Sequence, residues 1–340
     1  MKLILFCNLP YAFSMLKPLE DEAKKRGYNL LWYVPSAIIE EFPYPNSNYT
    51  SSITELESFK SDAIIVPGND VPYWLQGVKV QISHGLAGEK KDHFRIREYF
   101  DLYLTQGPYF TDRFQALADK HKNFEVIETG WCRLDRLFVR DKVIETKKKE
   151  LLEKYNVKNI VLYAPTFSPS LTSGDKLVDT IDRLSLNSDI LVIIKFHDKM
   201  SPKIKEKYQS LENKNLIISN EKDITPLLMI SDLMISDTSS VVYEFLLQDR
   251  PVVTLNTISD TINWENLNSE SEVEPKVLDI LNGNDRFDRE KTINLYHPLT
   301  DGKSAIRMID AILDYKNRHG VPTHRRLPPL RKWKMWRKYA

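Results

Sequence analysis

The sequence of 340 residues lacks several features that would point to a particular chemistry. Its two cysteines, Cys7 and Cys132, predict no disulfide framework and have no metal-ligand spacing, so we expect free thiols in a reducing compartment. A Gly-x-Gly-x-x-Gly fingerprint is absent, which argues against nicotinamide or flavin chemistry, and a Walker phosphate loop is absent too. No Asp-x-Asp motif follows a predicted strand, so we expect no metal and no other cofactor.

Long apolar runs are also missing. No segment approaches the roughly 20 apolar residues that a membrane-spanning helix needs. The apolar run at residues 3–6 is too short for the core of a signal peptide and is soon followed by Pro10. We therefore expect a cytoplasmic protein that does not cross the bilayer, and we interpret residues 3–6 as a first strand.

Net charge is only +1, which gives no reason to expect a nucleic-acid partner, but the charge is unevenly distributed. Residues 319–340 carry seven Arg or Lys and no acid, which leaves −6 for the rest of the chain. Trp333 and Trp336 would share one face of a helix with cations around it, a composition typical of an interfacial anchor. We predict that residues 325–340 attach the protein to the anionic inner face of the cell membrane. A nucleic-acid-binding segment and a disordered, solubilising tail are the alternatives.

Short apolar runs alternate along the chain with longer segments of helical pattern, which predicts βαβ units and parallel sheets. The expected strands are residues 3–6, 30–34, 63–66, 78–83, 102–105, 124–128, 160–164, 190–196, 216–219, 233–236 and 252–255. The expected helices are residues 16–26, 109–121, 141–156, 176–185 and 201–211, with another that contains Glu244. We predict an α/β fold of two Rossmann-like domains facing across a cleft, at residues 1–145 and 146–318, followed by the tail at 319–340.

The strongest local pattern lies at residues 233–254, where an apolar run, a hydroxyl-rich turn, a helix and a second apolar run follow one another. Thr238, Ser239 and Ser240 would stand at the opening of the helix, where unpaired backbone N–H groups attract an anion such as a diphosphate. Glu244 lies one turn further along the same face and could reach a ribose hydroxyl. The alternative is that these hydroxyls only cap the helix.

Two polar groups follow predicted strands of the first half. His84 and Gly85 form a loop whose backbone could approach a ligand, and histidine is the side chain best suited to accept a proton near neutral pH. A histidine hydrogen-bonded within the loop is the alternative. Arg133 could clamp a phosphate, or it could pair with Asp135, for which we favour a structural role.

Two further groups follow predicted strands of the second half. Thr166 lies in the loop after residues 160–164, on the side where strands of such sheets end and ligands bind. Lys195 and His197 would point to one face if their strand continues, and two cations there could neutralise a leaving diphosphate. Each group alone is a weak signal, but their order and their positions at strand ends are jointly specific.

These motifs resemble the CDP-glycerol glycerophosphotransferase family, which makes teichoic-acid-type polyol phosphate polymers and primers. The similarity runs from about residue 80 to residue 313. The matching motifs are Ser83-His84-Gly85, Gly130-Trp-Cys-Arg133-Leu-Asp135, Tyr163-Ala-Pro-Thr166, Ser236-Asp237-x-Ser239-Ser240-x-x-x-Glu244 and Asp301-Gly-Lys303-x-x-x-Arg307.

The resemblance implies a GT-B-like fold whose first half holds an acceptor and whose second half binds a CDP-linked donor. By this resemblance His84 is the general base and His197 a second catalytic residue, and CMP leaves as a glycerol or ribitol phosphate passes to a hydroxyl of a glycan or lipid-linked acceptor. The implied donor-binding residues are Thr166, Lys195, His197, Asp237, Thr238, Ser239, Ser240 and Glu244. Arg133 and Lys90 are candidate phosphate clamps, and no metal is implied.

Two departures from the family pattern put the substrate in doubt. Asp198 stands where the family usually has proline, and Glu89 stands where a lysine is common, with Lys90 next. Two other functions therefore remain open. One is a glycosyltransferase that uses a nucleotide sugar, and the other is a binding protein on an inactive transferase scaffold.

Overall fold

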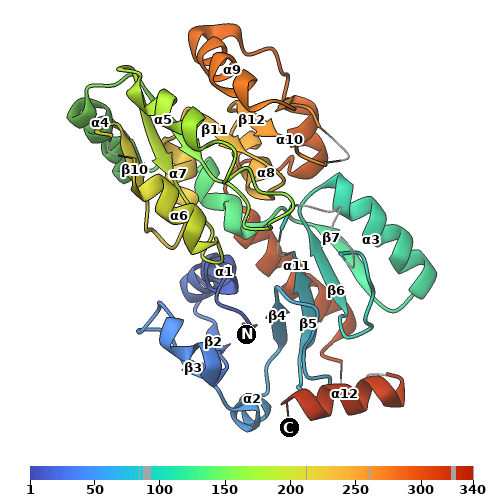
Figure 1. Cartoon of the computed structure of the whole chain (residues 1–340). Coiled ribbons are helices and arrows are strands. Elements are labelled where there is room, and N and C mark those ends of the chain that lie inside the picture. Colours follow the sequence, from blue (N-terminus) through green and yellow to red (C-terminus); the bar gives the residue numbers. More distant parts are fainter. Residues whose placement is uncertain (84, 87–92, 212, 260–261, 323–326, 340) are drawn as a thin grey trace. The chain divides into compact units, whose positions relative to one another are not determined.

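The chain forms two compact units that each contain a parallel sheet with helices (Figure 1). The first unit comprises Met1–Asp135 together with Asn294–Ala340, and the second comprises Arg136–Ile293. The structure is a computed structural model, and it describes residues 1–83, 85–86, 93–211, 213–259, 262–322 and 327–339.

The sheet of the first unit has the strand order β3-β2-β1-β4-β5-β6-β7, and each neighbouring pair is parallel. Its strands are β1 Lys2–Phe6, β2 Asn29–Tyr33, β3 Tyr49–Thr50, β4 Ala63–Val66, β5 Val78–Ile82, β6 Leu102–Thr105 and β7 Glu125–Glu128. The central strands are almost continuous apolar runs because both faces of a parallel sheet are covered. The strand order reverses between β1 and β4, which makes this the switch point of a doubly wound sheet.

Helices from both ends of the chain cover this first sheet. They are α1 Ala12–Lys25, η1 Ser36–Glu41, α2 Ile53–Phe59, α3 Pro108–His121, α11 Ser304–His319 and α12 Pro329–Tyr339. The segments η2 Cys132–Phe138 and α10 Glu290–Tyr296 contain the two points where the chain passes from one unit to the other. Helix α11 packs against α1, β5 and β6, so a segment near the carboxyl end completes the first core.

The sheet of the second unit has the order β10-β9-β8-β11-β12-β13, also parallel, and reverses between β8 and β11. Its strands are β8 Asn159–Tyr163, β9 Ile190–Ile194, β10 Leu216–Ile218, β11 Leu233–Ser236, β12 Val252–Leu255 and β13 Glu265–Leu267. Its helices are α4 Lys142–Tyr155, α5 Val178–Leu186, α6 Pro202–Gln209, α7 Thr225–Ile230, α8 Val241–Leu246, η3 Glu270–Glu272, α9 Val273–Asp279 and η4 Ile280–Asn284. The two strand orders confirm the predicted pair of Rossmann-like sheets.

The predicted domain boundaries are wrong for residues 136–145, which belong to the second unit, and for residues 294–318, which belong to the first. Asp135 holds α11 there, because its carboxylate oxygens accept hydrogen bonds from the backbone N–H groups of Ser304 (2.9 Å) and Ala305 (2.8 Å). Arg307 adds a bond from its Nε to the carbonyl oxygen of Thr129 (2.9 Å). The prediction failed because the amphipathic pattern of α11 shows that one face is buried but not which sheet buries it.

The basic tail forms helix α12, so the alternative of a disordered tail is wrong for Pro329–Tyr339. Met335 is buried, and the Tyr339 ring lies 5.7 Å from that of Phe6 at the end of β1. The Asn8 amide donates to the Tyr339 hydroxyl at 3.0 Å. The helix is therefore part of the first unit, and one of its sides is committed to packing there.

Candidate functional site

The predicted donor-binding residues of the second unit lie in loops that follow three adjacent strands. Strand β8 pairs with β9 on one side and with β11 on the other, and all three run in the same direction. Thr166 follows β8, Lys195 and His197 follow β9, and Thr238 begins the hydroxyl-rich turn after β11. The structure thus brings these residues to the carboxyl edge of one sheet, at its switch point, where open α/β sheets bind ligands.

Asp237 ties two of these loops together. One carboxylate oxygen accepts from the backbone N–H of Thr166 (2.9 Å), and the other accepts from the backbone N–H (2.7 Å) and the hydroxyl (2.8 Å) of Ser173. Burial raises the pKa of the Asp237 carboxyl, while these hydrogen bonds act to lower it. Because Asp237 is 0% exposed, we assign its predicted part in donor binding to positioning these loops rather than to direct contact.

The turn after β11 leaves its hydroxyl groups in reach of solvent. Thr238, Ser239 and Ser240 are partly exposed, whereas Ser236 is buried and its hydroxyl donates to the carbonyl oxygen of Ala164 (2.7 Å). Ser240 directly precedes α8, but its side chain makes no capping hydrogen bond to that helix. The capping alternative therefore does not account for Ser240, and the anion site at this turn remains a prediction.

Glu244 lies on α8, one turn after Ser240, and is 7% exposed. The residue as a whole is therefore largely enclosed by the protein. Its predicted contact with a ribose hydroxyl remains a prediction, which requires that the ligand reach the small exposed part of the residue.

The loop after β9 contains the predicted residues Lys195 and His197. Lys195 is partly buried, its ammonium donates to the carbonyl oxygen of Phe196 (2.7 Å), and burial lowers its pKa. His197 is exposed, and its Nδ1 accepts from the backbone N–H of Lys199 at 3.1 Å. A neutral His197 therefore carries its proton on Nε2. Its ring lies 4.3 Å from that of Phe167, which follows Thr166 in the neighbouring loop.

The first unit holds the remaining predicted residues. His84 and Lys90 lie outside the described residues, so their predicted roles are untested. Hydrogen bonds hold the residues on either side of His84: the amide of Gln106, on the segment after β6, donates to the carbonyl oxygen of Gly85 (2.9 Å), and the Ser83 hydroxyl also donates to this oxygen (2.9 Å). The backbone beside His84 is therefore held at the carboxyl end of β5.

Arg133 is partly buried near the start of α1. Its guanidinium donates to the Ser14 hydroxyl (2.8 Å) and lies 5.9 Å from the Trp131 ring. Its role as a phosphate clamp remains a prediction. The structural role favoured for Asp135 is confirmed, although the groups that it binds belong to α11.

Sequence reasoning missed the polar network beneath the donor-side loops. Ser173, which bonds Asp237, also lies 3.0 Å from the Tyr163 hydroxyl. The Tyr208 hydroxyl donates to the carbonyl oxygen of Gly174 (2.9 Å) and lies 3.4 Å from the Tyr163 hydroxyl. Burial raises the pKa of both tyrosines, so they stay neutral and act only as hydrogen-bonding groups. The sequence signal for this network was the Tyr163-Ala-Pro-Thr166 motif.

The described part of the chain shows neither a metal-binding cluster nor a membrane-spanning helix. Within it, no group of three or more His, Cys, Asp or Glu side chains could hold a metal ion. Among the helices that the structure describes, none combines the length and apolar character needed to cross a membrane.

Comparison with solved structures establishes the fold. The fold matches that of the wall teichoic acid polymerase TagF with a TM-score of 0.69 and 15% sequence identity, over 94% of this chain and 89% of that one. This likeness confirms the predicted GT-B-like fold built from two α/β domains.

Sequence comparison then identifies the family. Residues 76–259, more than half of the chain, match the family described as CDP-Glycerol:Poly(glycerophosphate) glycerophosphotransferase. The teichoic acid poly(glycerol phosphate) polymerase of Bacillus spizizenii is 26% identical over 282 residues, which are 73% of this chain and 69% of the relative. The teichoic acid ribitol-phosphate polymerase of Staphylococcus aureus is 26% identical over 178 residues, 48% of this chain and only 30% of the relative. The protein belongs to this glycerophosphotransferase family and is a transferase.

Proposed function

We propose that the protein transfers a polyol phosphate from a CDP-activated donor to a hydroxyl group of a glycan or lipid-linked acceptor in the synthesis of a cell-surface polymer. The observation that carries this proposal is the convergence of Thr166, His197 and the Thr238–Ser240 turn at the switch point of the second sheet. The family supplies the class of donor. The relatives act on glycerol phosphate or ribitol phosphate, so both polyols are candidates.

In the proposed reaction, the acceptor oxygen forms a bond to the phosphorus nearer the polyol. The bond between that phosphorus and the bridging oxygen breaks, and CMP leaves with the electron pair. The proton of the acceptor hydroxyl passes to His84, whose role as general base rests on the family motif. Hydroxyl groups at Ser239 and Ser240, with the Nε2–H of His197, donate to the diphosphate as its charge shifts toward CMP. Such a site works mainly by positioning and charge stabilisation.

Release of CMP tests the reaction directly. The protein is incubated with CDP-glycerol or CDP-ribitol in the presence of a lipid-linked acceptor, and we expect CMP to accumulate with one of the two. Activity in the presence of EDTA tests the further expectation that no metal is required. His84→Ala should abolish turnover while CDP binding survives, and a fully active variant would remove His84 from the reaction.

The second candidate function is that of a GT-B glycosyltransferase that uses a nucleotide sugar. Asp198 favours it, because this acid stands beside His197 where the family usually has proline. A thermal-shift panel of CDP, CMP, UDP and GDP separates the two, since a ligand that binds the native state raises its melting temperature. A preference for UDP would favour the glycosyltransferase. Binding of CDP-polyols without any CMP release would favour the inactive scaffold.

We also propose that α12 attaches the protein peripherally to an anionic membrane at its cytoplasmic face. Leu330, Trp333 and Trp336 are 63%, 52% and 59% exposed, lie three residues apart, and so share one side of this helix. An amphipathic helix with aromatic and cationic residues can lie in a lipid interface. Replacement of both tryptophans by serine should reduce co-sedimentation with phosphatidylglycerol vesicles. The control is a double change of two exposed apolar residues elsewhere, Val143→Ser and Leu186→Ser, which should leave it unchanged.

A further inference from the structure

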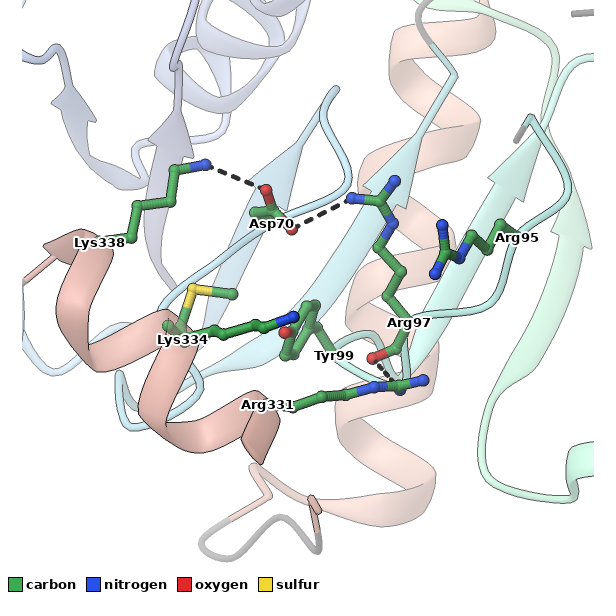
Figure 2. Close-up of a pocket in the computed structure, with 8 residues that line it drawn as sticks. Asp70, Arg95, Arg97, Tyr99, Arg331, Lys334 and Lys338 are labelled. Atoms are coloured by element: carbon green, nitrogen blue, oxygen red, sulfur yellow. Dashed lines mark hydrogen bonds and ion pairs between the residues drawn. The ribbon is translucent and has the colours of Figure 1, made fainter. Parts of the chain in front are cut away.

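Within the first unit, helix α12 and the segment before β6 line a cavity of about 300 Å³ that the predicted reaction does not use (Figure 2). This volume is at the lower end of the range for small-molecule pockets. The helix supplies three cations and the buried Met335, while the facing side comes from Asp70 and the segment before β6. The lining residues are Asp70, Arg95, Arg97, Tyr99, Arg331, Lys334, Met335 and Lys338.

Cations outnumber carboxylates in the described lining of this cavity. Its described lining holds five cations and one carboxylate, that of Asp70. Asp70 is shared, because it lies 3.0 Å from the Lys338 ammonium and 3.4 Å from the Arg97 guanidinium. Arg331 has a separate partner, Glu98, at 2.7 Å. One carboxylate thus serves two of the cations, and a concave surface lined by charges of one sign concentrates the potential that attracts an anion.

The geometry of these cations suits a phosphate group. In Figure 2, Arg97 and Lys338 reach Asp70 from opposite sides of the cavity, and Lys334 extends from α12 toward Tyr99. Arginine donates along two parallel N–H bonds to oxygens of a phosphate, and lysine adds a point charge. No ion pair of Lys334 is present among the described residues, so its charge is available to a ligand.

We propose that this cavity is a second anion site, distinct from the donor site, and that it binds the phosphate group of a phosphate ester. Arg97, Lys334 and Lys338 would hold the phosphate oxygens, with Asp70 as an internal counter-ion that the ligand displaces. Two sources carry this chemistry: a soluble polyol phosphate and the headgroup of an anionic phospholipid. The second source rests on the proposed membrane attachment, and the exposed side of α12 adjoins the cavity.

A matched pair of double variants of the full-length protein tests the site. Arg97→Gln with Lys334→Gln removes two charges from the cavity. Arg286→Gln with Lys291→Gln removes the same two charge types from exposed residues of the second unit, outside this lining and outside α12. Binding of glycerol 3-phosphate is measured by calorimetry, and binding of phosphatidylglycerol vesicles by co-sedimentation. We expect the cavity variant to weaken binding about tenfold or more in at least one arm, because each lost charge-assisted bond contributes on that scale. The control variant should change it less than threefold.

The two arms also identify the source. A loss confined to glycerol 3-phosphate indicates a soluble ester, and a loss confined to vesicles indicates a lipid headgroup. Equal losses for both variants would mean unspecific charge attraction and would overturn the proposal. So would the absence of binding in both arms, or an effect restricted to an added oligonucleotide. Binding is measured without a CDP donor, so the result does not depend on whether the protein is an active transferase. Failure of the anion-site proposal would likewise leave the expected CMP release unchanged.

Asp70→Asn provides a test with the opposite sign. If the cluster is only structural, loss of this carboxylate lowers the melting temperature, and the affinity for phosphate esters does not rise above that of the native protein. If the cavity is an anion site, the variant frees Arg97 and Lys338 for the ligand, and affinity for glycerol 3-phosphate or for vesicles should rise several-fold. An unchanged affinity in the variant would contradict the role of Asp70 as a displaced counter-ion.

Discussion

Replacement of Asp237 by asparagine separates positioning of the donor loops from simple folding. The amide keeps one oxygen for the backbone N–H of Thr166, but its NH₂ group then faces the backbone N–H of Ser173, which is left without an acceptor. A buried donor that loses its partner costs about 1–3 kcal/mol, and removal of a buried charge offsets part of this. We expect the free energy of unfolding of the second unit to fall by about 2 kcal/mol.

The functional consequence of Asp237→Asn should be larger than its effect on folding. The loops that contain Thr166 and Ser173 lose their common tie, so the site is no longer preformed and CDP affinity should fall about tenfold or more, even at temperatures where the variant is fully folded. Calorimetric titration with CDP measures this loss, and urea unfolding measures stability.

Asp232→Asn is the matched control. Asp232 precedes β11 at the opposite end of the same strand, and its carboxylate also accepts a backbone N–H, that of Ile160, at 2.9 Å. Asp232→Asn should lower the free energy of unfolding on a similar scale and leave CDP affinity within about twofold of that of the native protein. If both variants lost CDP affinity in proportion to their stability, the positioning role of Asp237 would be refuted.

Three further predictions concern other parts of the chain. Burial lowers the pKa of His297 from 6.5 to about 4, so the unfolded chain binds a proton that the folded protein excludes. The free energy of unfolding of the first unit should therefore fall by on the order of 3 kcal/mol as the pH drops from about 6.5 to 4. Urea unfolding at several pH values measures this loss, and His297→Gln should remove the pH dependence. Gly130→Ala should lower the free energy of unfolding by about 2–4 kcal/mol, because its φ is +80° and a Cβ would collide with the Ser304 hydroxyl. The control Gly27→Ala, at φ +70° in open space, should lower it by only about 1 kcal/mol. Thermal unfolding measures both. Tyr163→Phe should cost about 1 kcal/mol and weaken CDP binding, since it removes a hydroxyl from the network beneath the site; unchanged binding would mean that the network only supports the fold.

The elements of the fold were largely predictable because their signals are local. Asp141 accepts hydrogen bonds from the first N–H groups of α4, and Asn156 ends that helix with φ +53°, so a helix over 141–156 follows from the residues at its two ends. Apolar runs such as residues 160–163 predict buried parallel strands, because both faces of such a strand are covered. The order of these elements then limits the topology to a doubly wound sheet.

What the sequence could not show depends on contacts between distant residues. Asp135 binds Ser304 at the start of α11, and the two residues are 169 positions apart in the sequence. No local pattern indicates that this helix returns to the first sheet. Asp237 stands among hydroxyl residues that are partly exposed, and only the folded loops show that its carboxylate points inward. The cation cluster at Arg97 likewise forms only when α12 packs against the segment before β6.

The central claim is that the turn after β11 holds the diphosphate of a CDP-linked donor. Calorimetric titration of CDP into the native protein and into the Ser239→Ala, Ser240→Ala double variant tests it most directly. We predict that the double variant binds CDP at least tenfold more weakly while its melting temperature without ligand is retained within a few degrees. Equal CDP affinity in the two proteins would contradict the account.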